Sequence, residues 1–282
     1  MTITLSKLPS PLSLYAQAAG SARRRPGAQI EIPRLSVRID NFRANPAQLA
    51  GYNKVCGFAD AGTLPITFPQ VMATGLQMYL MIQPQFPLPL LGLVHLRNSI
   101  VQTRPLRADE SFTVDVSLGE ARSVRSGLEF DVVTEYLAEE TVVYRALMTV
   151  LHRIAGPRGG KSKPEPLDAE LVEYRNFDVP ADIGRRYAMV GKDFNPIHLT
   201  AASARLFGFK RAIAHGMWSL ARCAALLQEG RSTSPCELQV QFKQPLFLPG
   251  KVALKFRDTG GQTQFTLLAR ASDKVHLAGS LR

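Results

Sequence analysis

Apolar and polar residues alternate with a period of two in several stretches of the chain, as they do in half-buried β-strands. Residues 112–116 and 252–256 each place an apolar side chain at every second position. Further alternating runs lie at residues 128–136, 141–151, 264–271 and 275–281. We expect each run to form a strand of an antiparallel sheet, because alternation suits a sheet with one covered and one solvated face.

Two other stretches have the apolar spacing of a helix that packs on a core. They are residues 70–82 and residues 217–229. In the second stretch the apolar positions are Met217, Leu220, Ala221, Ala224 and Leu227. Each predicted helix precedes several predicted strands, which indicates an α+β fold. One helix wrapped by a curved antiparallel sheet is the hot-dog fold, and the chain carries the elements of two.

The two sets of elements also align as an internal repeat. Residues 96–106 match residues 236–246 at an offset of 140, and both segments end in Pro-Leu. The segment that begins at Tyr52 matches the segment at Tyr187 at an offset of 135. The pattern predicts a double hot-dog, although unrelated alternating strands can also resemble one another by chance.

Composition divides the chain into four parts. Residues 155–168 are rich in Gly, Pro and Lys and are typical of a linker. The linker separates a half at residues 28–154 from a half at residues 169–282. Residues 1–27 form a short amphipathic N-terminal arm. Its basic cluster at residues 23–25 follows the apolar stretch, which is the reverse of a secretory signal, so we expect a cytoplasmic protein.

Charge and cysteine content limit the function classes. The formal net charge is +11, and basic chains attract nucleic acids, phosphorylated cofactors or acidic carrier proteins. The basic residues are spread along the chain without a nucleic-acid-binding motif, so we expect no nucleic acid partner. No run reaches the roughly 18 apolar residues of a membrane span. The spacing of Cys56, Cys223 and Cys236 fits no metal site.

Polar residues suited to catalysis gather around Pro196. Asp193 and Asn195 precede this proline, and His198 follows it. Proline disfavours helical geometry in the residue before it and has no N–H to donate. Asp193 and Asn195 should therefore lie on an irregular loop.

A short helix should follow this loop. Thr200 is a good N-cap, residues 201–207 read as one helix, and Gly208 can end it. His198 then lies just before the helix, within reach of the loop that carries Asp193. A carboxylate and an imidazole that converge in this way are suited to general acid/base catalysis on a small substrate.

The same segment resembles the MaoC-like (R)-specific enoyl-CoA hydratases and 3-hydroxyacyl dehydratases. The family pattern is Ser-Gly-Asp-x-Asn-Pro-(Ile/Leu)-His, followed later by His-Gly-Met. This chain keeps Asp193, Asn195, Pro196, Ile197, His198, His215, Gly216 and Met217. It departs from the pattern at Gly191-Lys192, where the family usually has Ser-Gly. The resemblance implies a double hot-dog whose second half is catalytic.

The implied reaction is the hydration of a trans-2-enoyl thioester, or the reverse dehydration. It needs a base to activate water for attack at C3, an acid to protonate C2, and a donor to hold the thioester oxygen. Asp193 and His198 can share the proton transfers through one water. The backbone N–H of Gly216 can hold the oxygen, because it opens a predicted helix whose first N–H groups are free.

Two nearby residues have alternative roles. Asn195 suits an organiser of the loop, since Asn before Pro favours turns, and a substrate contact is its second role. His215 can hold the loop or contact the substrate. Together with Asp193 and His198 it offers metal-ligand types, but their spacing matches no known zinc pattern, and we expect no metal.

The first half carries no equivalent acid/base pair. At the offset of 135, Phe58 stands at the position of Asp193, and Thr63 stands at that of His198. Neither side chain can transfer protons near neutral pH. We therefore expect one active site per chain, with the first half as a scaffold and a wall of the acyl pocket.

These observations favour a lyase of fatty-acid or related acyl metabolism that needs no separate cofactor. Its substrate would be an acyl thioester of coenzyme A or of an acyl carrier protein, and two chains could pair as a homodimer. A catalytically silent hot-dog protein that binds acyl thioesters or a partner subunit remains open because of Lys192. A hot-dog thioesterase would share the fold but would not need the Asp193 to His198 pattern.

Overall fold

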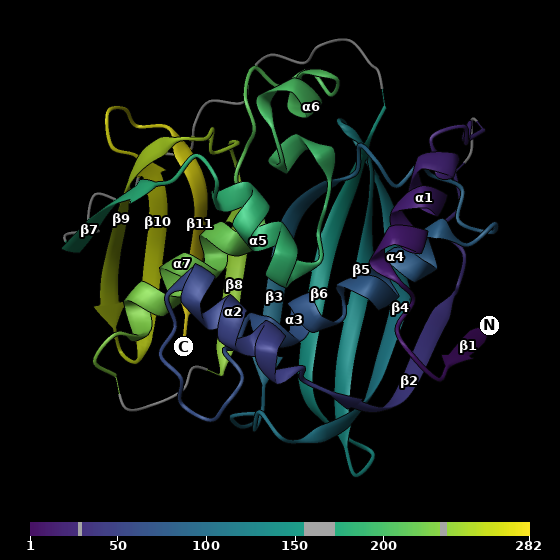
Figure 1. The fold of residues 1–282 in the computed structure, drawn as a ribbon, viewed down its shortest axis with the longest axis horizontal. Coiled ribbons are helices and arrows are strands. Elements are labelled where there is room, and N and C mark those ends of the chain that lie inside the picture. The colour runs from purple at the N-terminus through teal and green to yellow at the C-terminus, as the bar shows by residue number, and fades with distance from the viewer. Residues whose placement is uncertain (28–29, 155–172, 232–235) are drawn as a thin grey trace.

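A computed structural model describes residues 1–27, 30–154, 173–231 and 236–282. Within these residues eleven strands form one sheet, and the helices lie across one of its faces (Figure 1). The strand order is β1-β2-β4-β5-β6-β3-β8-β11-β10-β9-β7. The predicted linker at residues 155–168 lies outside the described residues, so the domain boundaries remain predictions.

The predicted alternating runs all form strands. The first six strands are β1 (Thr2–Leu5), β2 (Ser36–Arg43), β3 (Val94–Gln102), β4 (Ser111–Val124), β5 (Gly127–Ala138) and β6 (Thr141–Arg153). The other five are β7 (Glu173–Val179), β8 (Glu237–Phe242), β9 (Gly250–Thr259), β10 (Gln262–Ala269) and β11 (Val275–Leu281). Only residues 270–271 of a predicted run lie beyond its strand. Every pairing is antiparallel except that of β1 with β2.

The halves meet where β3 pairs with β8. Ser99 faces Gln239 in this antiparallel pair, and Arg97 faces Gln241. Ser99 and Gln239 are equivalent at the offset of 140, so the pairing places a strand against its own copy. An antiparallel pair centred on equivalent residues is what a two-fold relation between two halves produces. The register thus supports the repeat, and the chain is an α+β double hot-dog.

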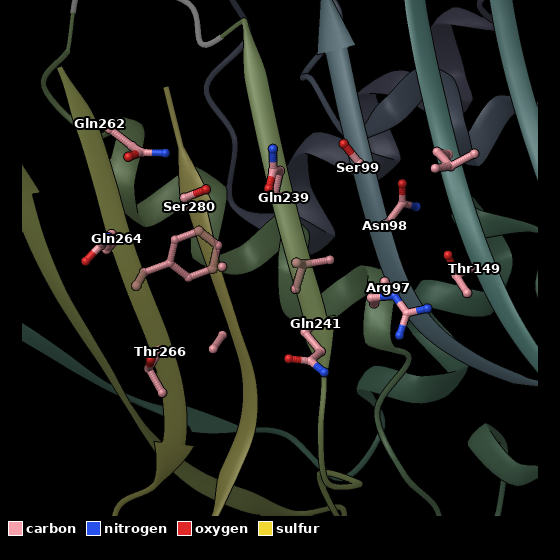
Figure 2. Close-up of a pocket in the computed structure, with 15 residues that line it drawn as sticks. Arg97, Asn98, Ser99, Thr149, Gln239, Gln241, Gln262, Gln264, Thr266 and Ser280 are labelled. Atoms are coloured by element: carbon pink, nitrogen blue, oxygen red, sulfur yellow. The ribbon is translucent and has the colours of Figure 1, made fainter. Parts of the chain in front are cut away.

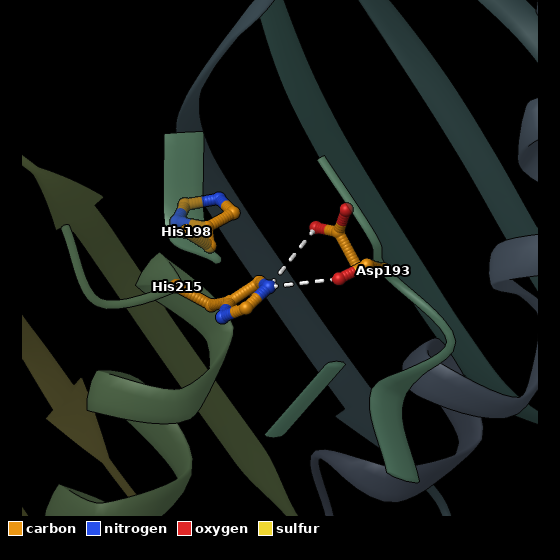
Figure 3. A group of neighbouring side chains, drawn as sticks. All are labelled: Asp193, His198 and His215. Carbon is orange, nitrogen blue, oxygen red and sulfur yellow. Dashed lines mark hydrogen bonds and ion pairs between the residues drawn. The ribbon is translucent and has the colours of Figure 1, made fainter. Parts of the chain in front are cut away.

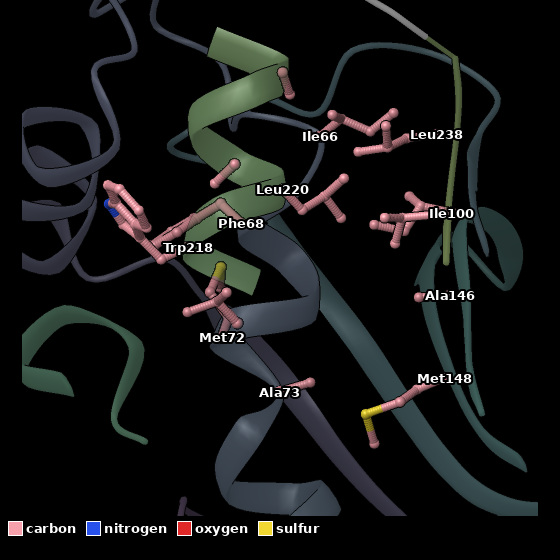
Figure 4. Packing of buried hydrophobic residues seen from close by; sticks show 14 of the residues in the cluster. Ile66, Phe68, Met72, Ala73, Ile100, Ala146, Met148, Trp218, Leu220 and Leu238 are labelled. Atoms are coloured by element: carbon pink, nitrogen blue, oxygen red, sulfur yellow. The ribbon is translucent and has the colours of Figure 1, made fainter. Parts of the chain in front are cut away.

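A central helix fills the concave side of each half. In the second half it is α7 (Gly216–Gln228), whose residues Leu220 and Ala224 are fully buried, as the sequence predicts. In the first half the single predicted helix is instead two, α3 (Phe68–Met72) and α4 (Thr74–Ile82). They join at Ala73, whose ψ of −1° interrupts the helical geometry. The two central helices share one core, in which Trp218 lies beside Phe68 and Met72 (Figure 4).

A second pair of equivalent helices packs together at the junction. These are α2 (Pro46–Cys56) and α5 (Ile183–Gly191). The rings of Tyr52 and Tyr187 lie 6.1 Å apart between centroids, and both side chains are buried. Because these tyrosines are equivalent at the offset of 135, the contact again relates one half to the other. The helix pair brings the end of α5 beside the first half.

The N-terminal arm is folded onto the first half. Its strand β1 extends the sheet, and its helix α1 (Pro11–Ser21) packs on α4. Leu14 and Ala18 bury their side chains against Met78 and Ile82 in a small separate core. The Arg24 guanidinium donates four hydrogen bonds to carbonyl oxygens at and beyond the end of α4, those of Met81, Ile82, Gln83 and Leu88. A cation there satisfies carbonyls that the helix leaves free.

The opposite face of the sheet is polar. A hollow of about 660 Å³ lies over β3, β8, β10 and β11, and glutamine, serine and threonine side chains line it (Figure 2). None of the predicted site residues belongs to its lining. The helices of the described ranges are all too short or too polar to span a membrane.

Candidate active site

The loop that carries Asp193 begins at an unusual backbone position. Helix α5 ends at Gly191, and Lys192 follows with φ 55° and ψ 22°, in the left-handed region. This is where the family pattern has glycine, which adopts such angles without strain. Lys192 holds this left-handed conformation at a strain of roughly 1–2 kcal/mol. The departure from the family pattern at Gly191-Lys192 thus lies on a left-handed residue directly before Asp193.

Hydrogen bonds within the loop fix its path, and Asn195 makes two of them. Its side-chain oxygen accepts the N–H of Ile197 at 3.3 Å, and its own N–H donates to Asp193 Oδ1 at 3.1 Å. The one-turn 3-10 helix η1 (Pro196–His198) follows. The side-chain oxygen of Asn195 thus organises the turn, which is the first of its two predicted roles. Its contact with substrate remains a prediction.

A short helix after η1 confirms the local sequence signals. Helix α6 (Ala201–Arg205) starts from Thr200, whose hydroxyl accepts the N–H of Ser203 at 3.0 Å. Ser203 hydrogen-bonds back to Thr200, and the two complete a capping box. Gly208 follows with φ 81°. This rigid unit holds η1, and so His198, in place.

Asp193 presents its two carboxylate oxygens to different neighbours. Oδ1 accepts hydrogen bonds from the Asn195 N–H and, at 2.9 Å, from the hydroxyl of Tyr15. Oδ2 lies 3.9 Å from Nε2 of His215 (Figure 3). Burial alone would raise the pKa of Asp193, but the imidazoles of His215 and His198 and these hydrogen bonds hold it below the ordinary value. The group is therefore a carboxylate at neutral pH.

His198 is oriented as a proton acceptor. Its Nδ1 lies 2.8 Å from the carbonyl oxygen of Ile213. A carbonyl oxygen only accepts, so we assign the proton of the neutral ring to Nδ1, and Nε2 carries a free lone pair. Burial lowers the pKa of His198 below its ordinary value. The ring is therefore neutral at pH 7 and can take a proton at Nε2.

His215 holds the loop from the other side. Its Nε2 donates to the backbone oxygen of Asp193 at 3.0 Å, and its ring stacks on that of His198, with centroids 3.7 Å apart (Figure 3). Only 2% of the residue is exposed, and burial lowers its pKa to about 3. His215 is thus a neutral ring that holds the loop, and its contact with substrate remains a prediction. Its Nδ1 has no hydrogen-bond partner among the described residues.

Gly216 opens helix α7, as the sequence predicts. The structure adds a second reason for a glycine at this position. A Cβ at Gly216 would lie 2.9 Å from the ring of Phe242, closer than real contacts allow. The glycine thus makes room for an aromatic ring of β8, and close substrate approach alone does not explain it. Gly216 and Met217 are both partly exposed, so the start of α7 faces open space. Its first N–H groups have no carbonyl partner within the helix.

Asp193, His198 and His215 form the one cluster of metal-ligand types found in the described part of the chain. Their candidate ligand atoms lie within 4.8 Å of one another. However, Nε2 of His215 and Nδ1 of His198 are each hydrogen-bonded to a backbone carbonyl. The chemistry of the cluster therefore suits proton transfer at least as well as metal binding. The absence of a metal remains a prediction.

Two residues near Asp193 carry no recognisable sequence signal. Tyr15 lies in the N-terminal arm, 178 residues from the carboxylate that it contacts. His95 lies on β3, where its ring packs against Phe242 with centroids 4.8 Å apart. Burial lowers the pKa of His95 to about 4, against a smaller opposing effect of the Asp193 charge. Only the fold brings Tyr15 of the arm and His95 of the first half to a loop of the second half.

Comparisons with known proteins agree with this geometry. Residues 162–278 match the MaoC like domain. The chain is 32% identical to 3-hydroxyacyl-thioester dehydratase X of Mycobacterium tuberculosis over 279 residues, which cover 97% of this chain and 98% of that protein. A crystal structure of the mycobacterial protein has a TM-score of 0.76, with 29% identity, and covers 88% of this chain and 99% of its own.

A more distant structure shows the fold alone. The MaoC-like dehydratase from Phytophthora capsici has a TM-score of 0.73 at 15% identity, covering 89% of this chain and 95% of its own. The mycobacterial similarity, in contrast, extends over nearly the full length of both chains and includes the first half. The chain therefore belongs to the MaoC-like dehydratase family of hydro-lyases.

Proposed function

We propose that the chain catalyses the reversible hydration of trans-2-enoyl thioesters to (R)-3-hydroxyacyl thioesters. The observation that carries this proposal is the joint position of the Asp193 carboxylate and the His198 imidazole beside the start of α7. Both groups are in the protonation state that a base requires at neutral pH. The name of the mycobacterial relative, a 3-hydroxyacyl-thioester dehydratase, supports the same substrate class.

The hydrogen bonds around the pair assign an atom to each step. Oδ1 of Asp193 already accepts two donors, so Oδ2 is the oxygen available to a water molecule. Nε2 of His198 is the free ring nitrogen. A water held between these two atoms attacks C3 and gives up one proton to the pair, which returns a proton to C2. Dehydration runs the same transfers in reverse.

The N-terminus of α7 stabilises the charge that develops during this attack. As the C3–O bond forms, negative charge moves to the thioester oxygen. We assign the holding of that oxygen to the N–H of Gly216, with the positive end of the α7 dipole, because Gly216 is the first residue of α7. Such a donor acts more strongly on the enolate-like state than on the neutral thioester, and it therefore lowers the barrier.

The acyl group arrives on coenzyme A or on an acyl carrier protein. Both carriers are anionic, and a chain of net charge +11 attracts either one. No separate cofactor takes part in the proposed steps. A role in fatty-acid or related acyl metabolism in the cytoplasm follows from this substrate class, and the chain can act as a homodimer.

Product analysis of the pure protein tests the proposal. Crotonyl-CoA and trans-2-decenoyl-CoA are incubated with the protein, and the products are separated by chain length and by configuration at C3. We expect (R)-3-hydroxyacyl-CoA, formed on the order of a hundredfold more slowly by Asp193→Asn protein under the same conditions. Binding of enoyl-CoA without any product would support a silent acyl-binding protein instead, and release of free coenzyme A would indicate a thioesterase.

A further inference from the structure

The contact between Tyr15 and Asp193 is directional. The Tyr15 hydroxyl lies 2.7 Å from the backbone nitrogen of Phe194, which can only donate. The hydroxyl therefore accepts from Phe194 and gives its single hydrogen to Asp193 Oδ1 at 2.9 Å. One side chain thus binds both the backbone of the catalytic loop and its carboxylate.

The ring of Tyr15 is held where this contact requires it. It meets the Phe194 ring edge-to-face, with centroids 6.0 Å apart and an interplanar angle of 88°. Leu14, the preceding residue of α1, is buried against α4. Beyond the end of α1, Arg24 ties the arm to four backbone carbonyls. The arm therefore presents the hydroxyl from a fixed support on the first half.

The hydroxyl shapes how Asp193 can react. With Oδ1 bound by Tyr15 and by the Asn195 N–H, proton exchange is directed to Oδ2, on the side of the two imidazoles. Burial and the charge of Asp193 raise the pKa of Tyr15 far above its ordinary value. The phenol therefore stays protonated at every pH at which the protein works, and it donates a hydrogen bond rather than a proton.

From this geometry we infer that Tyr15 is a positioning residue of the active site, and that the N-terminal arm completes the catalytic loop. The inference rests on the proposed hydration as the reaction that is affected. The effect of Tyr15 on the pKa and orientation of Asp193 does not depend on that reaction, because a hydrogen bond to the ionised carboxylate favours the charged form and holds its orientation.

Tyr15→Phe is the direct test, because it removes the hydroxyl and keeps the ring against Phe194. A hydrogen bond to a charged group is worth enough that kcat should fall by roughly tenfold to a hundredfold, while KM changes by less than about threefold. The acidic limb of the pH profile should move to higher pH, since Asp193 loses a donor that keeps it ionised. Tyr79→Phe is the matched control, because Tyr79 packs on the same small core of α1 and α4.

A titration that needs no turnover separates this inference from the proposed function. The carboxyl carbon of Asp193 is followed by NMR against pH, with its signal assigned by its loss in Asp193→Asn. The pKa of Asp193 should rise by about one unit in Tyr15→Phe and stay unchanged in Tyr79→Phe. If the wild type is inactive but the pKa of Asp193 still rises in Tyr15→Phe, the proposed hydration is contradicted and the role of Tyr15 stands. An unchanged pKa in Tyr15→Phe would overturn the inference, whatever the activity.

The tie at Arg24 provides a second variant. Arg24→Gln removes hydrogen bonds that lie in the arm and outside the site, so it should lower kcat only through the placement of Tyr15. The double variant should then be no slower than Tyr15→Phe alone, because the two changes remove the same contact. If the losses of kcat in the two single variants multiply in the double variant, the arm only stabilises the fold.

Discussion

The two halves contain the same helix ending, but only the second uses it for chemistry. Helix α2 is followed by Gly57 with φ 84°, and α5 is followed by Lys192 with φ 55°. The next residue is Phe58 in one half and Asp193 in the other. Phe58 stacks on Tyr52, with ring centroids 6.1 Å apart. The residue after the shared turn is therefore a core aromatic side chain in the first half and a carboxylate in the second.

The halves differ further in the segment that follows, and here the predicted alignment of Thr63 with His198 is wrong. Thr63 bridges to Arg107 just as Ile213 bridges to Phe247, and the next N–H groups, of Leu64 and Ala214, repeat the match. Thr63 is thus the counterpart of Ile213.

The corrected alignment shows how the first half lacks a histidine. Only 12 residues separate Tyr52 from Leu64, but 27 separate Tyr187 from Ala214. The additional length of the second half contains η1 and α6, the unit that positions His198. The first half therefore lacks the whole segment, and no single substitution can supply it. The site therefore depends on the inserted unit of η1 and α6 as well as on the identity of its residues.

The largest effect that the comparison predicts is the loss of the acid/base pair. Asp193→Asn and His198→Ala should each lower the hydration rate by on the order of a hundredfold or more, the scale of general acid/base catalysis. Steady-state kinetics on enoyl-CoA measures the loss, and circular dichroism checks that the variants fold. Near-wild-type turnover in either variant would refute the assignment.

The matched control lies at the equivalent position of the first half. Phe58→Leu should keep the wild-type rate. Phe58→Asp should gain no second site, because η1 and α6 have no counterpart beside it. Hydratase activity clearly above that of Asp193→Asn alone, in a protein that carries both Asp193→Asn and Phe58→Asp, would contradict the comparison.

A smaller effect concerns acyl chain length. The first half has no catalytic residues to support, so its side chains are free to line a longer tunnel, and each buried methylene contributes about 0.8 kcal/mol. Catalytic efficiency on the ten-carbon enoyl-CoA should therefore exceed that on crotonyl-CoA by at least about tenfold. A clear preference for the four-carbon substrate would show that the tunnel is closed.

The side chains that the sequence predicts for that wall pack in two different places. The sequence suggests Val71, Met72, Leu76, Met78, Tyr79 and Leu80 of the first-half helices. Met78 belongs to the small core beneath α1, and Tyr79 packs against both that core and the large shared one. Met72 lies beside Trp218 in the shared core (Figure 4). The Trp218 indole N–H donates to the Val55 oxygen at 3.2 Å, which fixes that ring. Met72→Phe should therefore reduce the efficiency on the ten-carbon substrate more than on crotonyl-CoA.

The smallest effect concerns the two matched helix ends. Lys192→Gly should raise the free energy of unfolding by roughly 1 kcal/mol, because glycine adopts a positive φ without strain. Gly57→Ala should lower it by more than this, because the added Cβ takes on the same backbone strain and also collides with the Arg222 guanidinium, which hydrogen-bonds to the Cys56 oxygen. Denaturant unfolding measures both changes. A destabilised Lys192→Gly protein would show that the lysine side chain contributes more than its backbone strain removes.

The elements of this fold follow from local patterns, which is why the sequence predicts them. Alternation locates the strands, the offset of 140 anticipates the register of Ser99 against Gln239, and Thr200 marks the start of α6. Such signals depend on residues that are close in the chain. They do not predict the break between α3 and α4 at Ala73, because the apolar spacing continues across it.

The parts of the site that the sequence does not reveal depend on long-range packing. Asp193 and His198 belong to a compact motif, but Tyr15 reaches the same carboxylate only because α1 docks on α4 and α5 lies beside the first half. The error at Thr63 has a related origin. A constant offset cannot detect an inserted segment, and only the bridge to Arg107 reveals it.

The stoichiometry of ligand binding distinguishes one active half per chain from two. Wild-type protein can be titrated with decanoyl-CoA by calorimetry, because the saturated acyl chain has no double bond to hydrate during the measurement. The account predicts one molecule bound per chain, and no binding at the position of Phe58 in the first half. Two equivalent sites per chain would contradict it.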